Sequence, residues 1–417
     1  MLAEENKVFN NLYGQNGVTL DIAKKLGSFA DLKGILEKGS DFIINEMKAS
    51  NLKGRGGAAF SVGMKWSFIS KDDPRDRYLV INGDEGEPGT CKDRELLRHE
   101  PYKLIEGIII ASYAIKAKAC YVYIRGEFAE EAKVLQKAID ECYQDKLLGT
   151  NCLGLYDLDV YIHLGAGAYI CGEETALLES LEGRKGFPRL KPPFPANCGL
   201  YSSPTVINNV ETIATVPAIL YRGAKWYSSI GVENSAGTKL FCISGHVNNP
   251  CVVEEEMGVS LKDMIETHAR GVIGGWDNLL AVIPGGASTP ILPKNFCDRL
   301  NMDFDSLKGA GSALGTGAIM VFNKNTNLLK VIHNIVHFYY DESCGQCTPC
   351  REGSGGALKL LNKFMNNQGT AKDIDALDNL VGRTLGTSIC GLNDATVFAV
   401  KGFLKHYKDL LLEKSIN

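Results

Sequence analysis

The sequence contains no hydrophobic stretch long enough to cross a membrane. Its longest apolar run, from Leu104 to Ile115, is interrupted by Glu106 and Gly107 and falls short of the roughly 18 residues that a spanning helix needs. The N-terminal segment has neither the apolar core of a signal peptide nor the arginine bias of a transit peptide. We therefore expect no direct membrane insertion, and a cytosolic protein or the mature form of an organellar one.

The sequence also lacks an excess of basic over acidic residues, and its cysteines are too few by one to pair completely. Lysine and arginine total 45 against 49 acidic residues, for a net charge of -4, whereas nucleic-acid-binding domains are usually basic. This balance argues against nucleic acid as a partner.

The number of cysteines, 13, is odd, which fits a complete disulfide framework poorly. Reduced thiols are expected, some binding metal and others, such as Cys120 and Cys242, filling the core.

Length and composition indicate a folded protein of several domains. The 417 residues are 45% hydrophobic and 23% charged, as in globular proteins, and the length corresponds to two to four domains of about 150 residues. Glycine is abundant, with 45 residues, and its freedom from a side chain permits close backbone approaches.

Hydrophobic periodicity predicts an α/β region followed by a smaller module and a helical end. Strands alternate with helices in the first region, which predicts an α/β sheet; the strands are expected at 78–82, 120–124 and 159–163, and the helices at 102–116, 127–142 and 174–183. A small α+β module is indicated next by strands at 239–243 and 279–283 with a helix at 260–268 between them. From residue 327 onward the pattern predicts a helical bundle.

Three cysteines at a spacing of three residues form the most specific chemical motif. Cys344, Cys347 and Cys350 lie in one Gly- and Pro-containing loop, and Cys390 follows 40 residues after Cys350. Three close thiolates and one remote thiolate are typical of an iron-sulfur cluster. Structural zinc more often uses two separated pairs, and unliganded thiols are the third alternative.

A glycine-rich loop, Gly54-Arg-Gly-Gly-Ala-Ala59, resembles a dinucleotide-binding fingerprint without its usual strand before it. Glycines such as Gly56 and Gly57 let a backbone approach a phosphate, and Arg55 and Lys65 add positive charge. A tight turn with solvated cations explains the same residues.

Acidic residues gather at two further loops. The first loop, Gly165 to Gly172, follows a predicted strand and leads into a helix that begins with Glu173 and Glu174. Ligands of open α/β sheets gather at such carboxyl ends of strands. Stabilisation of the helix N-terminus by the two carboxylates is the alternative explanation. Asn82 leads into a turn with Asp84, Glu85 and Glu87, which can accept hydrogen bonds from sugar hydroxyls or can be simply hydrophilic. Carboxylates beside a dinucleotide would repel a 2'-phosphate, so NADH is expected to be preferred to NADPH.

The segment 185–194 alternates cations and aromatic residues, including Lys191 and Phe194. Such a loop can stack on rings and pair with phosphates. It can equally be a rigid Pro-rich crossover.

Four long motifs occur in one order, namely Gly54 to Trp66, Asn82 to Asp93, Gly165 to Ala176 and Glu342 to Gly353. Together they resemble the NADH-binding flavoprotein subunits of respiratory complex I, NADH:ubiquinone oxidoreductase, over nearly the whole chain. The departures are small: Ala59 stands where the family usually has glycine, Val62 where threonine is frequent and Gly83 where alanine is frequent.

The resemblance implies three domains. These are a Rossmann-like α/β domain binding FMN and NADH at 1–237, a ubiquitin-like α+β module (a soluble-ligand-binding β-grasp) at 238–326, and a helical domain at 327–417 that holds one 4Fe-4S cluster on Cys344, Cys347, Cys350 and Cys390.

The same resemblance implies the binding residues. NADH is expected to contact Phe60, Phe68, Glu87, Glu174, Lys191 and Phe194; FMN is expected to contact Gly54, Arg55, Gly56, Gly57, Lys65, Asn82, Asp84, Glu85, Tyr169, Gly172, Glu173, Glu174, Asn208, Asn209 and Thr212. No catalytic acid or base is expected, because hydride transfer to a flavin needs alignment more than a proton-transferring side chain.

By resemblance the protein is an FMN-dependent NADH dehydrogenase that accepts a hydride from NADH and passes electrons singly through the cluster toward quinone. The implied partners are a thioredoxin-like 2Fe-2S subunit and a large multi-cluster iron-sulfur subunit. The implied location is the peripheral arm of complex I, on the mitochondrial matrix side of the inner membrane or the bacterial cytoplasmic side of the plasma membrane.

A diaphorase subunit of an NAD-linked hydrogenase or formate dehydrogenase is the alternative. The sequence has no cysteine before Cys91 and only a short segment after Cys390, and in this it is closer to the complex I form. A structural subunit without redox activity is a further alternative, disfavoured by the intact motifs.

Overall fold

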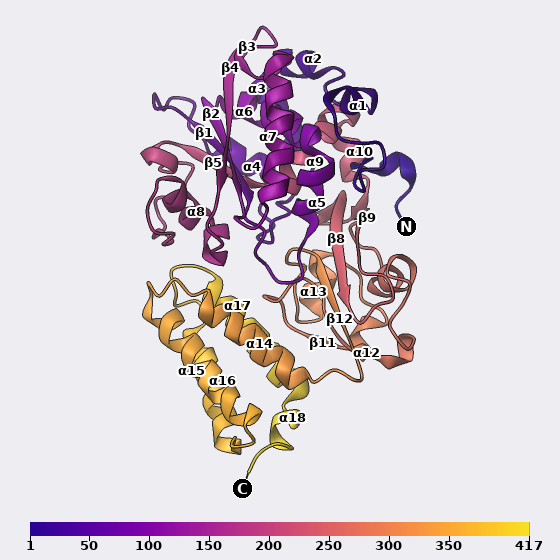
Figure 1. The fold of residues 1–417 in the computed structure, drawn as a ribbon, viewed down its shortest axis with the longest axis vertical. Helices are drawn as coiled ribbons and strands as arrows, with labels where there is room; N and C mark the ends of the chain where they lie inside the picture. The colour runs from indigo at the N-terminus through magenta and orange to yellow at the C-terminus, as the bar shows by residue number, and fades with distance from the viewer. Residues whose placement is uncertain (417) are drawn as a thin grey trace.

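A mostly parallel five-stranded sheet organises the first half of the chain, in a computed structural model that describes residues 1–416 (Figure 1). The strand order is β3-β4-β2-β1-β5, and only β3 pairs antiparallel to its neighbour. The strands are β1 (Tyr78–Gly83), β2 (Ala119–Ile124), β3 (Gly149–Cys152), β4 (Tyr156–Leu164) and β5 (Thr205–Asn209).

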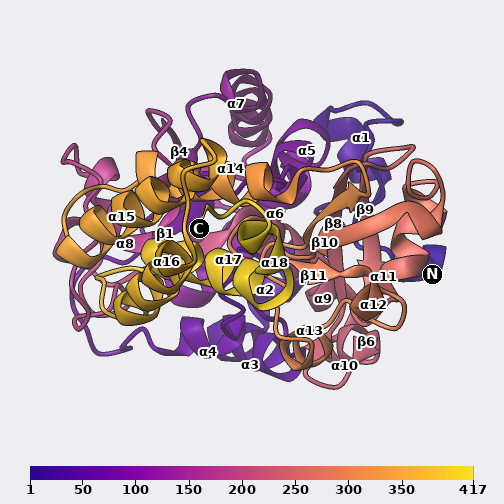
Figure 2. The ribbon, with the colours of Figure 1, turned by 90° about the horizontal axis from the view of Figure 1, so that it is seen from below.

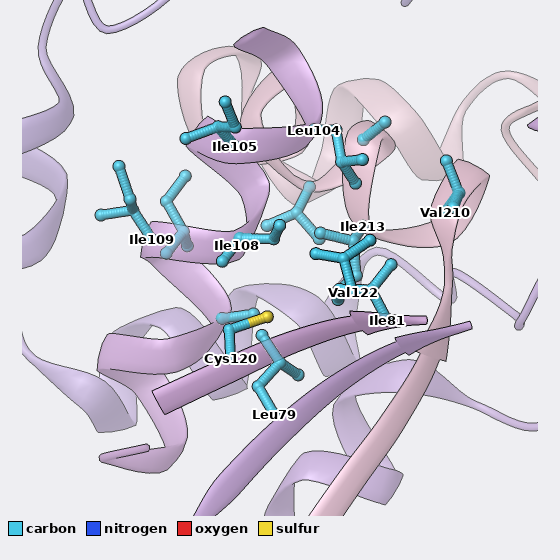
Figure 3. Close-up of a cluster of buried hydrophobic side chains, with 14 of the residues drawn as sticks. Leu79, Ile81, Leu104, Ile105, Ile108, Ile109, Cys120, Val122, Val210 and Ile213 are labelled. Atoms are coloured by element: carbon cyan, nitrogen blue, oxygen red, sulfur yellow. The ribbon is translucent and has the colours of Figure 1, made fainter. Parts of the chain in front are cut away.

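The core of this region lies between the sheet and a buried helix pair (Figure 3). Helix α6 (Pro101–Ile115) packs its isoleucines on Leu79, Ile81 and Val122, and α9 (Val210–Arg222) lies beside it. A Cβ on Gly107 would lie 2.1 Å from the Ile213 carbonyl oxygen, so only glycine permits this close approach of the two helices.

Eight further helices, all within the described residues, surround this core. The sheet connections contribute α5 (Lys92–His99), α7 (Ala129–Gln144) and α8 (Glu174–Leu181); the N-terminal segment and the end of the region contribute α1 (Leu20–Lys25), α2 (Leu32–Glu37), α3 (Ser40–Ala49), α4 (Val62–Ser67) and α10 (Ala224–Ser228).

The middle region is a second, mixed sheet with its own apolar core. Its order is β11-β10-β12-β8-β9, in which β12 and β8 are parallel and the other pairs are antiparallel. The elements are β8 (Thr238–Gly245), β9 (Cys251–Glu256), α11 (Leu261–Asp263), β10 (Leu279–Ile283), β11 (Leu292–Pro293), α12 (Lys294–Cys297), α13 (Phe304–Gly309) and β12 (Ala318–Asn323).

Four long helices and a short one form the C-terminal region. They lie at the lower end of the molecule in Figure 1 and face the viewer in Figure 2, which looks from below. They are α14 (Leu328–Asp341), α15 (Thr348–Met365), α16 (Ala371–Thr384), α17 (Leu392–Tyr407) and α18 (Asp409–Leu412). Their core also takes in Ala281, Ile283 and Ile291 of the middle region. Of the helices in residues 1–416, none combines the length and apolar composition that a bilayer crossing requires.

Candidate flavin and iron-sulfur site

A cavity of about 540 Å³ lies where the loops after β1, the segment before α8 and the start of α17 meet. Its volume is in the range of small-molecule and cofactor sites. Most of the residues expected to bind FMN line it, together with Glu87: Gly56, Gly57, Asn82, Asp84, Glu85, Glu87, Tyr169, Gly172, Glu173 and Asn209. The cysteine Cys390 and its neighbours Gly391 and Leu392 line the same cavity.

The glycine loop lines this cavity with Gly56, Gly57 and Ala58, so it presents backbone and one methyl group. Gly57 has a φ of 114°, a conformation that favours glycine. A Cβ on Gly56 would lie 3.2 Å from the Asn209 Cβ. Gly54 lies outside the cavity wall, where its N–H donates to the Phe60 carbonyl oxygen at 2.8 Å.

The Arg55 side chain points into the protein and away from the cavity. Its Nη2 donates to the Tyr227 hydroxyl at 2.9 Å and to the carbonyl oxygens of Ala236 and Thr238 at 3.0 and 2.8 Å. The side chain is 2% exposed. Thr212 likewise contacts the protein: its hydroxyl accepts a hydrogen bond from the Arg55 backbone N–H at 2.9 Å.

Asp84 is the carboxylate with unused hydrogen-bonding capacity at the cavity. Its Oδ2 is buried without a hydrogen-bond partner, and burial raises the pKa of Asp84 to about 7. A buried acceptor of this kind requires a donor. A cofactor that carries hydroxyl or ring N–H groups would supply one.

Glu85 and Glu87 are engaged with protein donors. Glu85 accepts from the N–H groups of Asp93 and Arg94 at 2.8 and 3.1 Å and so holds the first turn of α5; burial, with the nearby Asp93 carboxylate, raises the pKa of Glu85. Glu87 accepts from the Ser288 N–H and from the Tyr169 hydroxyl, both at 2.7 Å.

The segment before α8 contributes a second group of charges. Glu173 accepts from the N–H groups of Thr175 and Ala176 at the start of the helix. Burial alone would raise the pKa of Glu173, but hydrogen bonds from Thr175 and Lys191 outweigh it and lower that pKa. Lys191 pairs with Glu173 at 2.9 Å and with Glu174 at 2.8 Å.

The Lys65 ammonium lies against the sheet. It donates to the Ile207 carbonyl oxygen at 3.1 Å and lies 3.9 Å from Glu174 Oε2. Desolvation lowers the pKa of Lys65.

Three asparagines fix the loops around the cavity. Asn82 donates to the Gly172 carbonyl oxygen at 2.8 Å, and Asn208 accepts from the Trp66 indole at 2.9 Å. Asn209 caps α9 through its side-chain oxygen. These contacts tie the ends of β1 and β5 to the segments that surround them.

The aromatic residues expected at NADH lie outside the cavity wall and are exposed. Phe60 and Phe68 are 48% and 49% exposed, with ring centroids 5.9 Å apart, and Phe194 is 54% exposed. Exposed rings of this size are suited to stacking on a planar ligand.

Sequence reasoning did not select Lys92 and Asp93, which also line the cavity. The Lys92 ammonium is buried and lies 2.8 Å from both Asp93 Oδ1 and Glu211 Oε2, and these acids raise the pKa of Lys92 against its desolvation. A lysine and an acid inside a hydrophilic motif give no signal of burial, so the sequence could not distinguish them from surface charges.

The four cysteines of the motif lie in one cluster that packs on Tyr339, Leu392 and Ala395. Cys347 precedes α15, and Gly345 in the same loop has a φ of 75°. Burial raises the pKa of Cys390 to about 12; ligating a metal removes such protons, because the thiolate is the ligand. Within residues 1–416 no three His, Cys, Asp or Glu side chains are close enough to hold a single metal ion.

Three families match the chain in succession. The "Nuo51 FMN-binding domain" matches residues 47–218, the "SLBB domain" residues 239–321, and the "NADH-ubiquinone oxidoreductase-F iron-sulfur binding region" residues 330–414. These matches define the class of protein as an iron-sulfur flavoprotein. They confirm the expected fold class and the two expected cofactors, FMN and a 4Fe-4S cluster, and they favour the cluster over the zinc alternative.

Full-length relatives identify the family. The F subunit of NADH-quinone oxidoreductase in Rickettsia bellii (strain OSU 85-389) is 56% identical over 410 residues, which cover 98% of each chain. Its counterpart in Rickettsia typhi (strain ATCC VR-144 / Wilmington) is 56% identical and covers 100% of this chain and 99% of its own. The chain belongs to the family of NADH-quinone oxidoreductase F subunits, the NADH-oxidising subunits of complex I.

A solved structure shares the fold. An NAD+-reducing [NiFe]-hydrogenase in the H2-reduced state superposes with a TM-score of 0.84 at 35% sequence identity over 90% of this chain. The chain spans 63% of that hydrogenase chain.

Proposed function

We propose that this protein oxidises NADH within complex I and passes the electrons singly to partner subunits toward ubiquinone. The observation that carries the proposal is the shared cavity wall. Gly57, Asp84 and Glu173 of the flavin region and the expected cluster cysteine Cys390 all line the same cavity. A ligand in this cavity would therefore lie next to a cluster ligand.

FMN, when bound, supplies a group that takes two electrons as a hydride and releases them one at a time, and the cluster supplies a one-electron carrier. The residues of the chain hold and orient these groups. Asp84 would accept a hydrogen bond through its unpartnered Oδ2, the Gly56 and Gly57 backbone would allow close approach, and Lys92 places a buried positive charge at the wall.

For the nicotinamide dinucleotide we propose the mouth of the cavity. The exposed rings of Phe60, Phe68 and Phe194 would stack on its planar groups. The carboxylates of Glu173 and Glu174, held beside Lys191, would disfavour the additional phosphate of NADPH.

The proposed partners are a thioredoxin-like 2Fe-2S subunit and a large subunit with several iron-sulfur clusters, in the peripheral arm of complex I. That arm would lie on the bacterial cytoplasmic side of the plasma membrane or on the mitochondrial matrix side of the inner membrane. The names of the relatives, F subunits of NADH-quinone oxidoreductase, support the assignment of this protein to complex I.

The test is an anaerobic titration of the purified flavin- and cluster-loaded protein with NADH, with NADPH as the control. We expect NADH to bleach the flavin absorbance and to produce the EPR signal of a reduced cubane cluster. Cys347→Ala, at an expected cluster ligand away from the cavity wall, should abolish that signal and leave the bleaching. Cys198→Ala, which removes a half-buried cysteine outside the cluster, should change neither.

A folded, fully metallated sample that binds no flavin or does not respond to NADH would contradict the proposal. An equal response to NADPH would contradict only the argument from the carboxylates.

A diaphorase subunit of an NAD-linked hydrogenase is the second candidate, favoured by the superposition on the hydrogenase chain. Isolation of the native complex decides between the two. Copurification with quinone-reductase subunits supports complex I, and copurification with a nickel-iron subunit supports the diaphorase.

A further inference from the structure

Two cysteines outside the iron-sulfur motif face each other between the flavin region and the middle region. Cys91 immediately precedes α5, and Cys242 lies within β8. The Cys91 N–H donates to the Cys242 Sγ at 3.3 Å, across 151 residues of sequence. The two residues are therefore in direct contact although the chain places them in different regions.

The environments of the two thiols differ in a way that suits successive reactions. Cys91 is partly exposed, and its neighbours Thr90 and Lys92 line the cavity, whereas Cys242 is 1% exposed. The hydrogen bond with the Cys242 thiol, assisted by Arg94, lowers the pKa of Cys91. The same contact and burial raise the pKa of Cys242. A partly exposed thiol of lowered pKa is the one that reacts first with an oxidant, because its thiolate is the nucleophile.

We propose that Cys91 and Cys242 are a peroxide-oxidised thiol pair that forms a disulfide between the flavin region and the middle region. The Cys91 thiolate attacks hydrogen peroxide, so that an S–O bond forms, the O–O bond breaks and hydroxide leaves with a proton as water. The Cys242 thiol then attacks the sulfenic sulfur of Cys91, which forms the S–S bond and releases a second water. The two thiols are oxidised by two electrons in total and one peroxide is reduced to two waters.

The disulfide would join the loop that carries Glu85 and Glu87, at the point where it enters α5, to the central part of β8. Cys251 is the competing thiol, because it lies on the adjacent strand β9 opposite Ile243 and is partly exposed. The direct contact with Cys91 belongs to Cys242, so the structure favours Cys242 as the resolving residue.

The experiment treats the full-length loaded protein with hydrogen peroxide, alkylates the remaining thiols with iodoacetamide after unfolding, and maps the peptides without reductant. We expect a linked peptide pair that contains Cys91 and Cys242, with equal loss of both residues from alkylation and recovery of both after dithiothreitol. Because the peroxide is added from outside, the result does not depend on NADH oxidation.

Two variants make the assignment specific. Cys242→Ser keeps a small polar acceptor for the Cys91 N–H; it should abolish the linked pair and leave a Cys91 sulfenic acid that dimedone labels. Cys251→Ser is the matched control and should give the same yield of linked pair as the unaltered protein.

Three results would overturn the proposal. They are a linkage of Cys91 to Cys251 in place of Cys242, oxidation of Cys91 to the sulfinic acid without any linkage in the unaltered protein, and full alkylation of both residues after peroxide treatment.

Discussion

At the scale of single residues, Asp84 shows how burial prepares a side chain for a ligand. Its Oδ2 is buried and unpartnered at the wall of the cavity. We expect Asp84→Ala to weaken FMN binding about tenfold, because a hydrogen bond contributes about 1.4 kcal/mol. Asp84→Asn keeps an acceptor oxygen and should recover most of the affinity. Titration of flavin-stripped protein with FMN, followed by fluorescence quenching, measures both.

The matched control for Asp84 is Asp394→Asn. Asp394 lines the same cavity, but its carboxylate accepts from the Gly386 N–H at 2.8 Å and is therefore already partnered. Unchanged FMN affinity in Asp84→Ala would refute the role given to this residue.

Arg55 is a residue whose importance we expect to be structural. Its guanidinium is buried and bonded to Tyr227, Ala236 and Thr238, a geometry that lysine cannot reproduce. Arg55→Lys should lower the free energy of unfolding by about 3 kcal/mol, the cost of disrupting a buried charged group. Urea denaturation measures the change. The control Arg75→Lys alters an exposed arginine that pairs with Asp73 and should cost less than about 1 kcal/mol; equal costs would contradict the argument.

At the scale of elements, a buried carboxyl on α6 attaches the N-terminal segment. Glu106 Oε1 accepts from the Phe29 N–H at 2.7 Å and from the Tyr221 hydroxyl at 2.5 Å, and burial raises the pKa of Glu106 to about 7. The folded state thus holds a proton that the unfolded state releases above its ordinary pKa of about 4.3. The free energy of unfolding should fall as the pH rises between about 4.3 and 7, by up to about 1.4 kcal/mol per pH unit, and level off above pH 7.

Glu106→Gln keeps the acceptor oxygen and removes the titration. Subtracting its denaturation midpoints from those of the unaltered protein across this pH window isolates the contribution of Glu106. A difference that does not vary with pH would show that the Glu106 pKa is not raised.

The elements with a strong pattern could be predicted from the sequence. Helix α6 and strands β1, β2 and β4 lie within a residue or two of the expected ranges, except that β4 begins earlier. Helix α6 and strands β1 and β2 are nearly continuous apolar runs that become buried, and the first half of β4 alternates buried and exposed residues. Helix α9 is not among the expected elements. Its apolar residues have helical spacing, but it contains Pro217; proline in a helix interior is normally unfavourable, and here packing against α6 outweighs that cost.

At the scale of the whole molecule, the three regions meet at the candidate site. Glu87 of the flavin region binds Ser288 of the middle region and Tyr169, and the Tyr169 N–H donates to Glu342, just after α14, at 3.0 Å. The motifs identified which loops build the site. The motifs could not predict that the side chains of Arg55 and Lys92 point into the protein. Their orientation depends on contacts with segments distant in sequence, namely residues 227–239 for Arg55 and Glu211 for Lys92.

The contact between α17 and the middle region provides a test of this arrangement that leaves the cavity residues unchanged. A Cβ on Gly402 would lie 2.7 Å from the Pro290 Cβ and 3.2 Å from the Ile291 backbone nitrogen. Gly402→Ala should therefore displace α17, whose first turn follows Cys390, and lower the free energy of unfolding by about 1–3 kcal/mol as overpacking does. We expect cluster reduction to slow while flavin reduction by NADH keeps its rate.

Rapid mixing with NADH separates the two steps, with flavin absorbance reporting the first and freeze-quench EPR the second. Gly382→Ala on α16 is the matched control, because its added Cβ meets only the flexible Lys401 ammonium at 3.3 Å; it should leave both rates unchanged. A normal rate of cluster reduction in a destabilised Gly402→Ala protein would show that the position of α17 does not govern electron transfer between the flavin and the cluster. Slowing of flavin reduction as well would place the effect at the cavity itself.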